Sequence, residues 1–115
     1  MTLFLDARLP LRFASVVEAG SASAVLVEGD LPAPVGVPTA RFRLNRTSAH
    51  APGCGCCAAR GPVAEALSEL FLARARGEVT FFRSVLAVVS NAEARAAVLA
   101  ALASDPVTAG RFRLA

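Results

Sequence analysis

The chain has 115 residues, of which 55% are hydrophobic and 18% charged, and its formal net charge is +3. This balance can fill the core of one domain spanning residues 1–115, and it excludes an intrinsically disordered chain. No apolar run approaches the roughly 20 residues of a membrane helix, and the first residues lack the basic region of a signal peptide, so we expect a cytoplasmic protein without membrane contact.

The basic residues and the cysteines indicate which partners to expect. All 12 basic residues are arginines scattered along the sequence, and aromatic residues are few. A nucleic-acid footprint is usually a concentrated stripe, so we expect no nucleic-acid partner. The three cysteines, Cys54, Cys56 and Cys57, are odd in number and closely spaced. This spacing is unlike a secreted disulfide framework and favours a metal-binding or redox-active cluster.

The first half of the chain predicts three strands and one helix. Thr2–Leu5 is a short apolar run typical of a strand, and Pro10 is suited to the first turn of a helix that ends at Gly20. Ala24–Val27 is an unbroken apolar run, which indicates a strand covered on both faces. After a proline-rich loop, apolar residues alternate with arginines over Ala40–Leu44, which predicts a strand near a sheet edge.

The second half predicts a loop, two helices and one strand. Asn45–Gly61 is polar and irregular and carries the cysteines. The clearest helix starts at Gly61-Pro62 and stops at Gly77. Its expected buried stripe consists of Val63, Leu67, Leu70 and Phe71. Val85–Val89 reads as a second buried strand.

The last helix of the sequence should start with a capping box. In this motif the Ser90 side chain binds an amide of the first turn, and Glu93 reaches back to the cap. The helix is expected to run to about Ala103, and Asp105-Pro106 to begin a short tail. Strands and helices alternate, so we expect an α/β fold with a small, mostly parallel sheet of four strands flanked by helices.

The cysteine-containing run, Gly53-Cys54-Gly55-Cys56-Cys57, is followed by Arg60-Gly61. It resembles the G-C-x-C-C motif of the CobW-type metallochaperone GTPases, a family of P-loop proteins. The likeness continues through Arg74-Ala75-Arg76-Gly77-Glu78 and Phe82–Val89. Asp105–Leu114 is similar to the family's D-P-x-x-A-x-[FY]-x-L stretch. The resemblance implies a reduced P-loop GTPase-like domain, truncated relative to the family.

The nucleotide-binding residues of that family are missing. A P-loop requires G-x-x-x-x-G-K-[ST], whose amides and lysine bind the phosphates and whose hydroxyl binds magnesium. Asp6–Phe13, which follows the first expected strand, has neither glycine nor lysine. Where the family has E-T-[ST]-G after a later strand, this chain has Val88-Val89-Ser90-Asn91. We therefore expect no bound nucleotide, no GTPase activity and no catalytic residues.

The thiols can be carried over from the family as Cys54, Cys56 and Cys57. Thiolates are preferred ligands of zinc and of softer metals, and a C-x-C pair can chelate one ion. His50, four residues earlier, is a candidate fourth ligand that the family motif does not imply; a water or a partner's ligand is the alternative. Two other interpretations stay open: idle small apolar residues, or a redox pair that vicinal Cys56-Cys57 would form only as a strained ring.

The function expected from these observations is binding or handling of a zinc-class ion without nucleotide turnover. The alternative is a degenerate GTPase-like protein that docks on a partner and whose thiols are idle. A small parallel sheet buries limited surface and leaves an edge unpaired. We therefore expect a homodimer or a protein partner.

Overall fold

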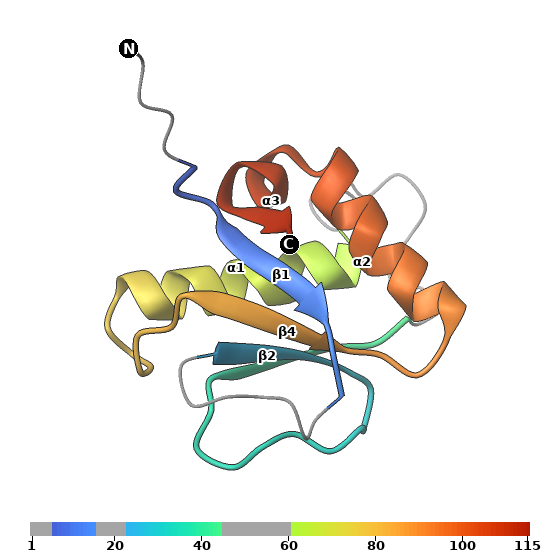
Figure 1. Cartoon of the computed structure of the whole chain (residues 1–115), viewed down its shortest axis with the longest axis horizontal. Helices are drawn as coiled ribbons and strands as arrows, with labels where there is room; N and C mark the ends of the chain where they lie inside the picture. Colours follow the sequence, from blue (N-terminus) through green and yellow to red (C-terminus); the bar gives the residue numbers. More distant parts are fainter. Residues whose placement is uncertain (1–5, 16–22, 45–60) are drawn as a thin grey trace, which may run out of the picture.

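The computed structural model describes residues 6–15, 23–44 and 61–115, which form a five-stranded parallel sheet with helices on one face (Figure 1). The spatial order of the strands is β3-β2-β4-β1-β5. The elements are β1 (Leu9–Phe13), β2 (Ser23–Glu28), β3 (Thr39–Phe42), α1 (Gly61–Ala75), β4 (Ser84–Val88), α2 (Ala92–Ser104), α3 (Pro106–Arg111) and β5 (Phe112–Leu114). The predicted α/β class is confirmed, with five strands rather than four.

The inner strands β2 and β4 follow the sequence pattern closely. They pair in parallel from Ser23 opposite Ser84 to Val27 opposite Val88. Their middle residues are almost completely buried, because helices cover one face and other chain segments the second. β3 lies at one edge of the sheet and alternates between exposed and buried residues, as the arginine alternation predicted.

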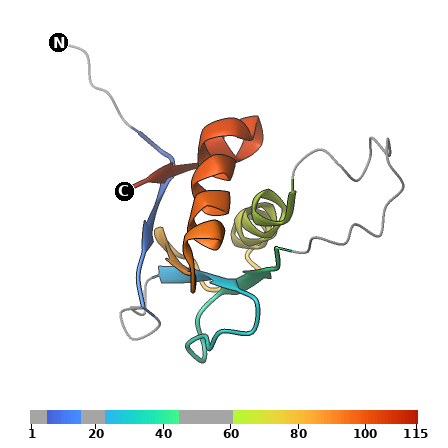
Figure 2. The same ribbon diagram turned by 90° about the vertical axis from the view of Figure 1, so that its right-hand side faces the viewer.

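The helices α1 and α2 lie side by side on one face of the sheet (Figures 1 and 2). Helix α1 buries Val63, Leu67 and Leu70, as predicted, and Phe71 is half-buried. Helix α2 turns Val98 into the same core. The space between sheet and helices therefore holds the main hydrophobic core.

The opposite face of the sheet is covered in part by the loop between β2 and β3. Leu31, Ala33 and Val37 of this loop pack on Val25, Val27 and Val88 in a second, smaller core cluster. The loop was predicted from its prolines, and Arg41 holds it in place by donating to the carbonyls of Gly29 at 2.8 Å and Leu31 at 2.7 Å.

The helix predicted from Pro10 is wrong, because Leu9–Phe13 is a strand between β4 and β5. A proline inside a sheet usually removes a ladder hydrogen bond. Ala14 donates its N–H to the Ala87 carbonyl of β4 at 3.1 Å. Backbone groups of successive residues in a strand point alternately to its two neighbours, so the nitrogen of Pro10, four positions before Ala14, also points toward β4. The pairing of β1 with β4 starts only at Leu11 opposite Val85, so the missing N–H of Pro10 costs no paired bond.

Two further predictions are corrected at the end of the chain. The N-cap of α2 is Asn91, whose Oδ1 accepts from the Ala94 amide at 2.8 Å, and not Ser90. Asp105 does not begin a tail: its carboxylate caps α3, which leads directly into β5. The strand predicted at Thr2–Leu5 and the predicted cysteine loop lie outside the described residues.

Candidate functional site

The predicted metal ligands His50, Cys54, Cys56 and Cys57 lie outside the described residues, but the residues that flank their segment are described. Leu44, two residues after β3, and Gly61, the first residue of α1, line the same surface groove of about 390 Å³. The segment that carries the thiols therefore leaves and re-enters the described structure at one place, beside the start of α1.

The walls of this groove are mostly apolar and come from α1, α2 and α3, together with Leu44. Its lining also includes Pro62, Val63, Ala97, Ala100, Ala101, Ser104, Asp105 and Pro106. The Asp105 carboxylate already accepts from the Thr108 amide at 2.9 Å and from the Thr108 hydroxyl at 2.8 Å. Asp105 is thus committed to capping α3.

The start of α1 is electrostatically suited to a nearby anion. The first turn of a helix carries unpaired N–H groups and the positive end of the helix dipole. The first turn of α1 contains no acidic residue that would neutralise it. Cys57 precedes Gly61 by four positions in the sequence. The thiols are therefore close in sequence to the end of α1 that favours negative charge.

The carboxyl ends of β2 and β4, where ligands often bind in parallel sheets, are joined by a side chain of the protein itself. One oxygen of Glu28, at the end of β2, accepts from the Ser90 amide at 2.7 Å and from the Ser90 hydroxyl at 2.8 Å. Ser90 is therefore engaged by Glu28 and leaves the helix cap to Asn91. No local sequence pattern indicates this contact, because the two residues are 62 positions apart.

The acidic residues near the carboxyl ends of the strands have structural roles. Asp30, in the turn after β2, forms an ion pair with Arg43, and the hydrogen bond from Arg43 lowers the pKa of the Asp30 carboxyl. Glu28 ends β2, and Asp30 lies two residues later in the turn that follows. Glu28 binds Ser90 and Asp30 binds Arg43, so the two carboxylates do not act as a pair suited to acid–base chemistry.

The position of β1 moves the place where a phosphate-binding loop would have to lie. Asp6–Phe13 was compared with a P-loop, but Leu9–Phe13 is itself a strand. The connection from β1 to β2 spans residues 14–22, whose sequence contains one glycine, Gly20, and no lysine. It also fails to match G-x-x-x-x-G-K-[ST], so the sequence argument against a P-loop holds at the corrected position.

Within residues 6–15, 23–44 and 61–115, no group of three or more His, Cys, Asp or Glu side chains is arranged to hold a metal ion. The same part of the chain contains no helix that is long and apolar enough to cross a membrane. Comparison of the chain with protein-family models, with curated proteins and with solved structures finds no match in any of the three.

Proposed function

We propose that this protein binds one zinc-class metal ion through the thiolates of Cys54, Cys56 and Cys57, without nucleotide turnover. The observation that carries the proposal is the run Gly53-Cys54-Gly55-Cys56-Cys57, similar to the CobW motif. Three thiols within four positions supply the soft donor set that zinc favours. His50 or a water supplies the fourth ligand.

The described surroundings of the segment support an anionic metal centre. Three thiolates around a divalent ion carry one net negative charge, or the same charge with a neutral imidazole as fourth ligand. The first turn of α1 presents a positive dipole end without a neutralising acid. The groove beside Leu44 and Gly61 is mostly apolar, and limited water around a site strengthens electrostatic interactions within it.

Cobalt substitution tests the proposal directly. Reduced, chelator-free protein titrated with Co²⁺ should develop thiolate-to-cobalt charge-transfer bands with a stoichiometry of about one ion. Each Cys→Ser variant should lower the band intensity, whereas Ser104→Ala, a change in the groove that removes no expected ligand, should leave it unchanged. Absence of these bands and of zinc uptake in the wild type would refute the metal function.

The pH dependence of binding provides a second readout. A free cysteine has a pKa near 8.5, so metal must displace protons at neutral pH and the affinity should rise with pH. His50→Ala should weaken binding as strongly as a cysteine change if the imidazole is the fourth ligand. It should have little effect if water occupies that position.

The same proposal predicts that magnesium-GTP does not bind. The chain has no lysine to neutralise the phosphates, and residues 14–22 do not form the required glycine pattern. Isothermal titration at micromolar concentrations should give no heat of binding. A saturable one-to-one isotherm would contradict the loss of nucleotide binding.

The competing function is that of an interaction protein whose thiols are idle. The observation that favours it is the sheet itself: β3 and β5 each pair with only one of the described strands. Unpaired edges are templates for pairing with another chain. Light scattering at high protein concentration should then give a dimer mass, or cross-linking in cells should recover a stable partner. A monomer with no partner would contradict this alternative.

A further inference from the structure

The fold gathers six arginines at the end of the sheet where its strands begin. This surface, the arginine end, consists of Arg8, Arg74, Arg76, Arg83, Arg111 and Arg113. Its members come from the start of β1, the end of α1, the approach to β4 and the α3–β5 junction. Leu9 pairs with Phe112, which places the preceding residues Arg8 and Arg111 next to each other.

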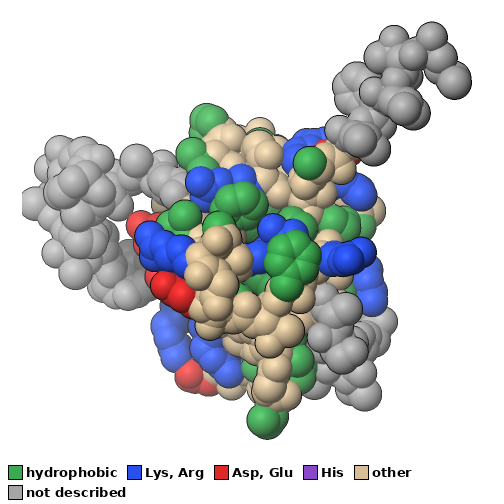
Figure 3. Space-filling view, turned by 90° about the vertical axis from the view of Figure 1, so that its left-hand side faces the viewer, with side chains coloured by type: hydrophobic (Ala, Val, Ile, Leu, Met, Phe, Trp, Pro, Cys, Tyr) green, Lys and Arg blue, Asp and Glu red, His purple; other side chains and the backbone are tan. Residues whose placement is uncertain are grey.

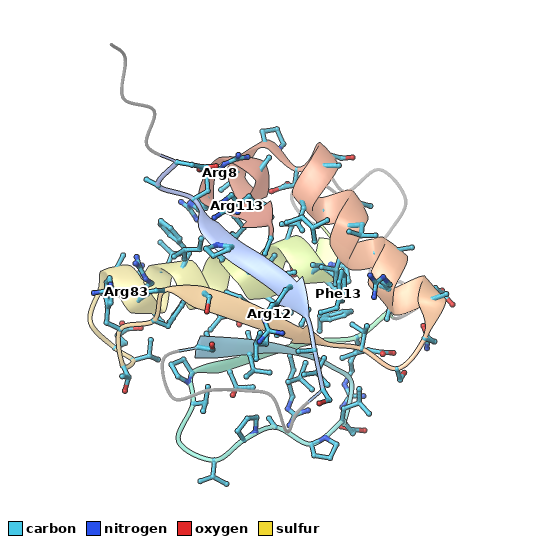
Figure 4. All side chains as sticks on the ribbon, viewed as in Figure 1. Arg8, Arg12, Phe13, Arg83 and Arg113 are labelled. Atoms are coloured by element: carbon cyan, nitrogen blue, oxygen red, sulfur yellow. The ribbon has the colours of Figure 1, made fainter. Side chains whose placement is uncertain are left out.

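The figures show the same grouping. Figure 4 shows Arg8 close to Arg113 at the start of β1, and Arg83 at the start of β4. Figure 3, which faces this end of the molecule, shows arginine and hydrophobic side chains alternating across the surface. Residues separated by up to 105 positions in the sequence therefore form one continuous surface.

Two of these guanidinium groups are held in place by aromatic rings. Arg74 lies 4.0 Å above the centre of the Phe81 ring and donates from Nε to the Phe82 carbonyl at 2.7 Å. Arg111 lies 4.4 Å above the Phe71 ring. A guanidinium stacked in this way keeps the edge of its plane available for bidentate contacts to carboxylates, and its orientation is fixed before binding.

The positive charge of this surface is only partly compensated. Asp6 contacts two arginines: its Oδ2 lies 2.8 Å from Arg8 and 3.6 Å from Nε of Arg113, and the latter nitrogen has no hydrogen-bond partner. Among the described residues, the other four arginines form no ion pair. Asp6 is thus the one carboxylate that the ion pairs of the described residues place against this surface, and the charge of most of its arginines is not compensated in this way.

We propose that the arginine end docks an extended, acidic segment of a protein partner. Charge complementarity selects an acidic ligand, and Phe81, which is 61% exposed and stacks against Arg74, offers an apolar contact for a side chain of that segment. Arg111 covers a face of the half-buried Phe71, and Arg74 covers one face of Phe81, so this surface lacks the row of open aromatic faces on which successive bases of a single strand stack. The edges of the guanidinium planes suit carboxylates. This inference is independent of the metal site.

Fluorescence anisotropy with a defined probe tests the docking surface. The probe is a short labelled peptide in which Glu alternates with Leu, and the control peptide carries Gln in place of Glu. The double variant Arg76→Gln and Arg83→Gln should bind the acidic peptide about fivefold more weakly than the wild type. The matched variant Arg43→Gln and Arg95→Gln makes the same change in net charge elsewhere and should bind as the wild type does. Affinity should also fall as salt rises.

Three results would overturn the proposal. Equal weakening by both double variants would mean that only net charge matters. Equal binding of the Gln peptide would show that the contact is not electrostatic. Tighter binding of a single-stranded oligothymidine that depends on Arg76 and Arg83 would assign the surface to nucleic acid. Because all four substituted arginines are exposed, the variants should keep the wild-type far-UV circular dichroism spectrum.

Discussion

Replacing Phe112 with Ala should destabilise the protein by about 3–5 kcal/mol, the usual cost of removing a fully buried phenylalanine. Phe112 is 1% exposed at the start of β5, and its ring meets the Phe71 ring edge-on with centroids 6.1 Å apart. A domain of this size is stable by about 5–15 kcal/mol, so the loss is a large part of the total. The melting temperature should fall by about 10–20 °C.

Urea unfolding followed by far-UV circular dichroism measures this effect, because the chain has no Trp or Tyr for intrinsic fluorescence. Leu114→Ala is the matched control in the same strand: Leu114 is 51% exposed, and its loss should cost less than about 1 kcal/mol. If Phe112→Ala unfolds at the same urea concentration as the wild type, residues 105–115 do not pack on the core and the assignment of β5 is refuted.

Three other predictions concern local interactions. Hydrogen bonds from Arg8 lower the pKa of Asp6 from 3.8 to about 2, so its ionised form stabilises the native state above about pH 4 and this contribution disappears as the pH falls towards 2; an NMR titration of the Asp6 carboxyl should show the low midpoint, and a midpoint near 4 would contradict the contact. Asn91→Ala should cost about 1 kcal/mol in urea unfolding and Asn91→Ser almost nothing, since serine is an equally good cap; equal losses would exclude Asn91 as the cap. Gly77→Ala should destabilise the protein by about 1 kcal/mol, because the φ of Gly77 is 72°. Gly110→Ala, inside α3 with open space around it, should stabilise the protein by about 0.5 kcal/mol in the same assay. A stabilising Gly77→Ala together with a destabilising Gly110→Ala would disprove the backbone assignment.

The candidate metal site depends on sequence, whereas the docking surface depends on the fold. The donor set proposed for Cys54, Cys56 and Cys57 rests on residues that are close together in the sequence, so it can be proposed without any long-range contact. The groove beside their segment is not, because it joins Leu44 and Gly61 to residues of α2 and α3. The arginine end is equally hidden, because its members are scattered in the sequence and meet only through strand pairing and helix packing.

The sequence by itself determined the elements that one local pattern specifies. Unbroken apolar runs identified β2 and β4, the alternation with arginines identified β3 as an edge strand, and Gly61-Pro62 with the following apolar stripe identified α1. Each of these patterns indicates which side chains of one segment are buried, and the order of apolar and polar residues within that segment is enough to show it.

Only the tertiary structure decided the elements whose local signals were ambiguous. Pro10 suits a helix start as well as a strand end, and it lies in β1 because Leu11 and its neighbours pair with β4 and β5. Ser90 and Asn91 are both good caps, and Glu28 decides between them by binding Ser90. β5 has only three residues and exists because β1, about a hundred positions earlier, supplies its partner. In each case the deciding contact is distant in sequence, so no local pattern can contain it.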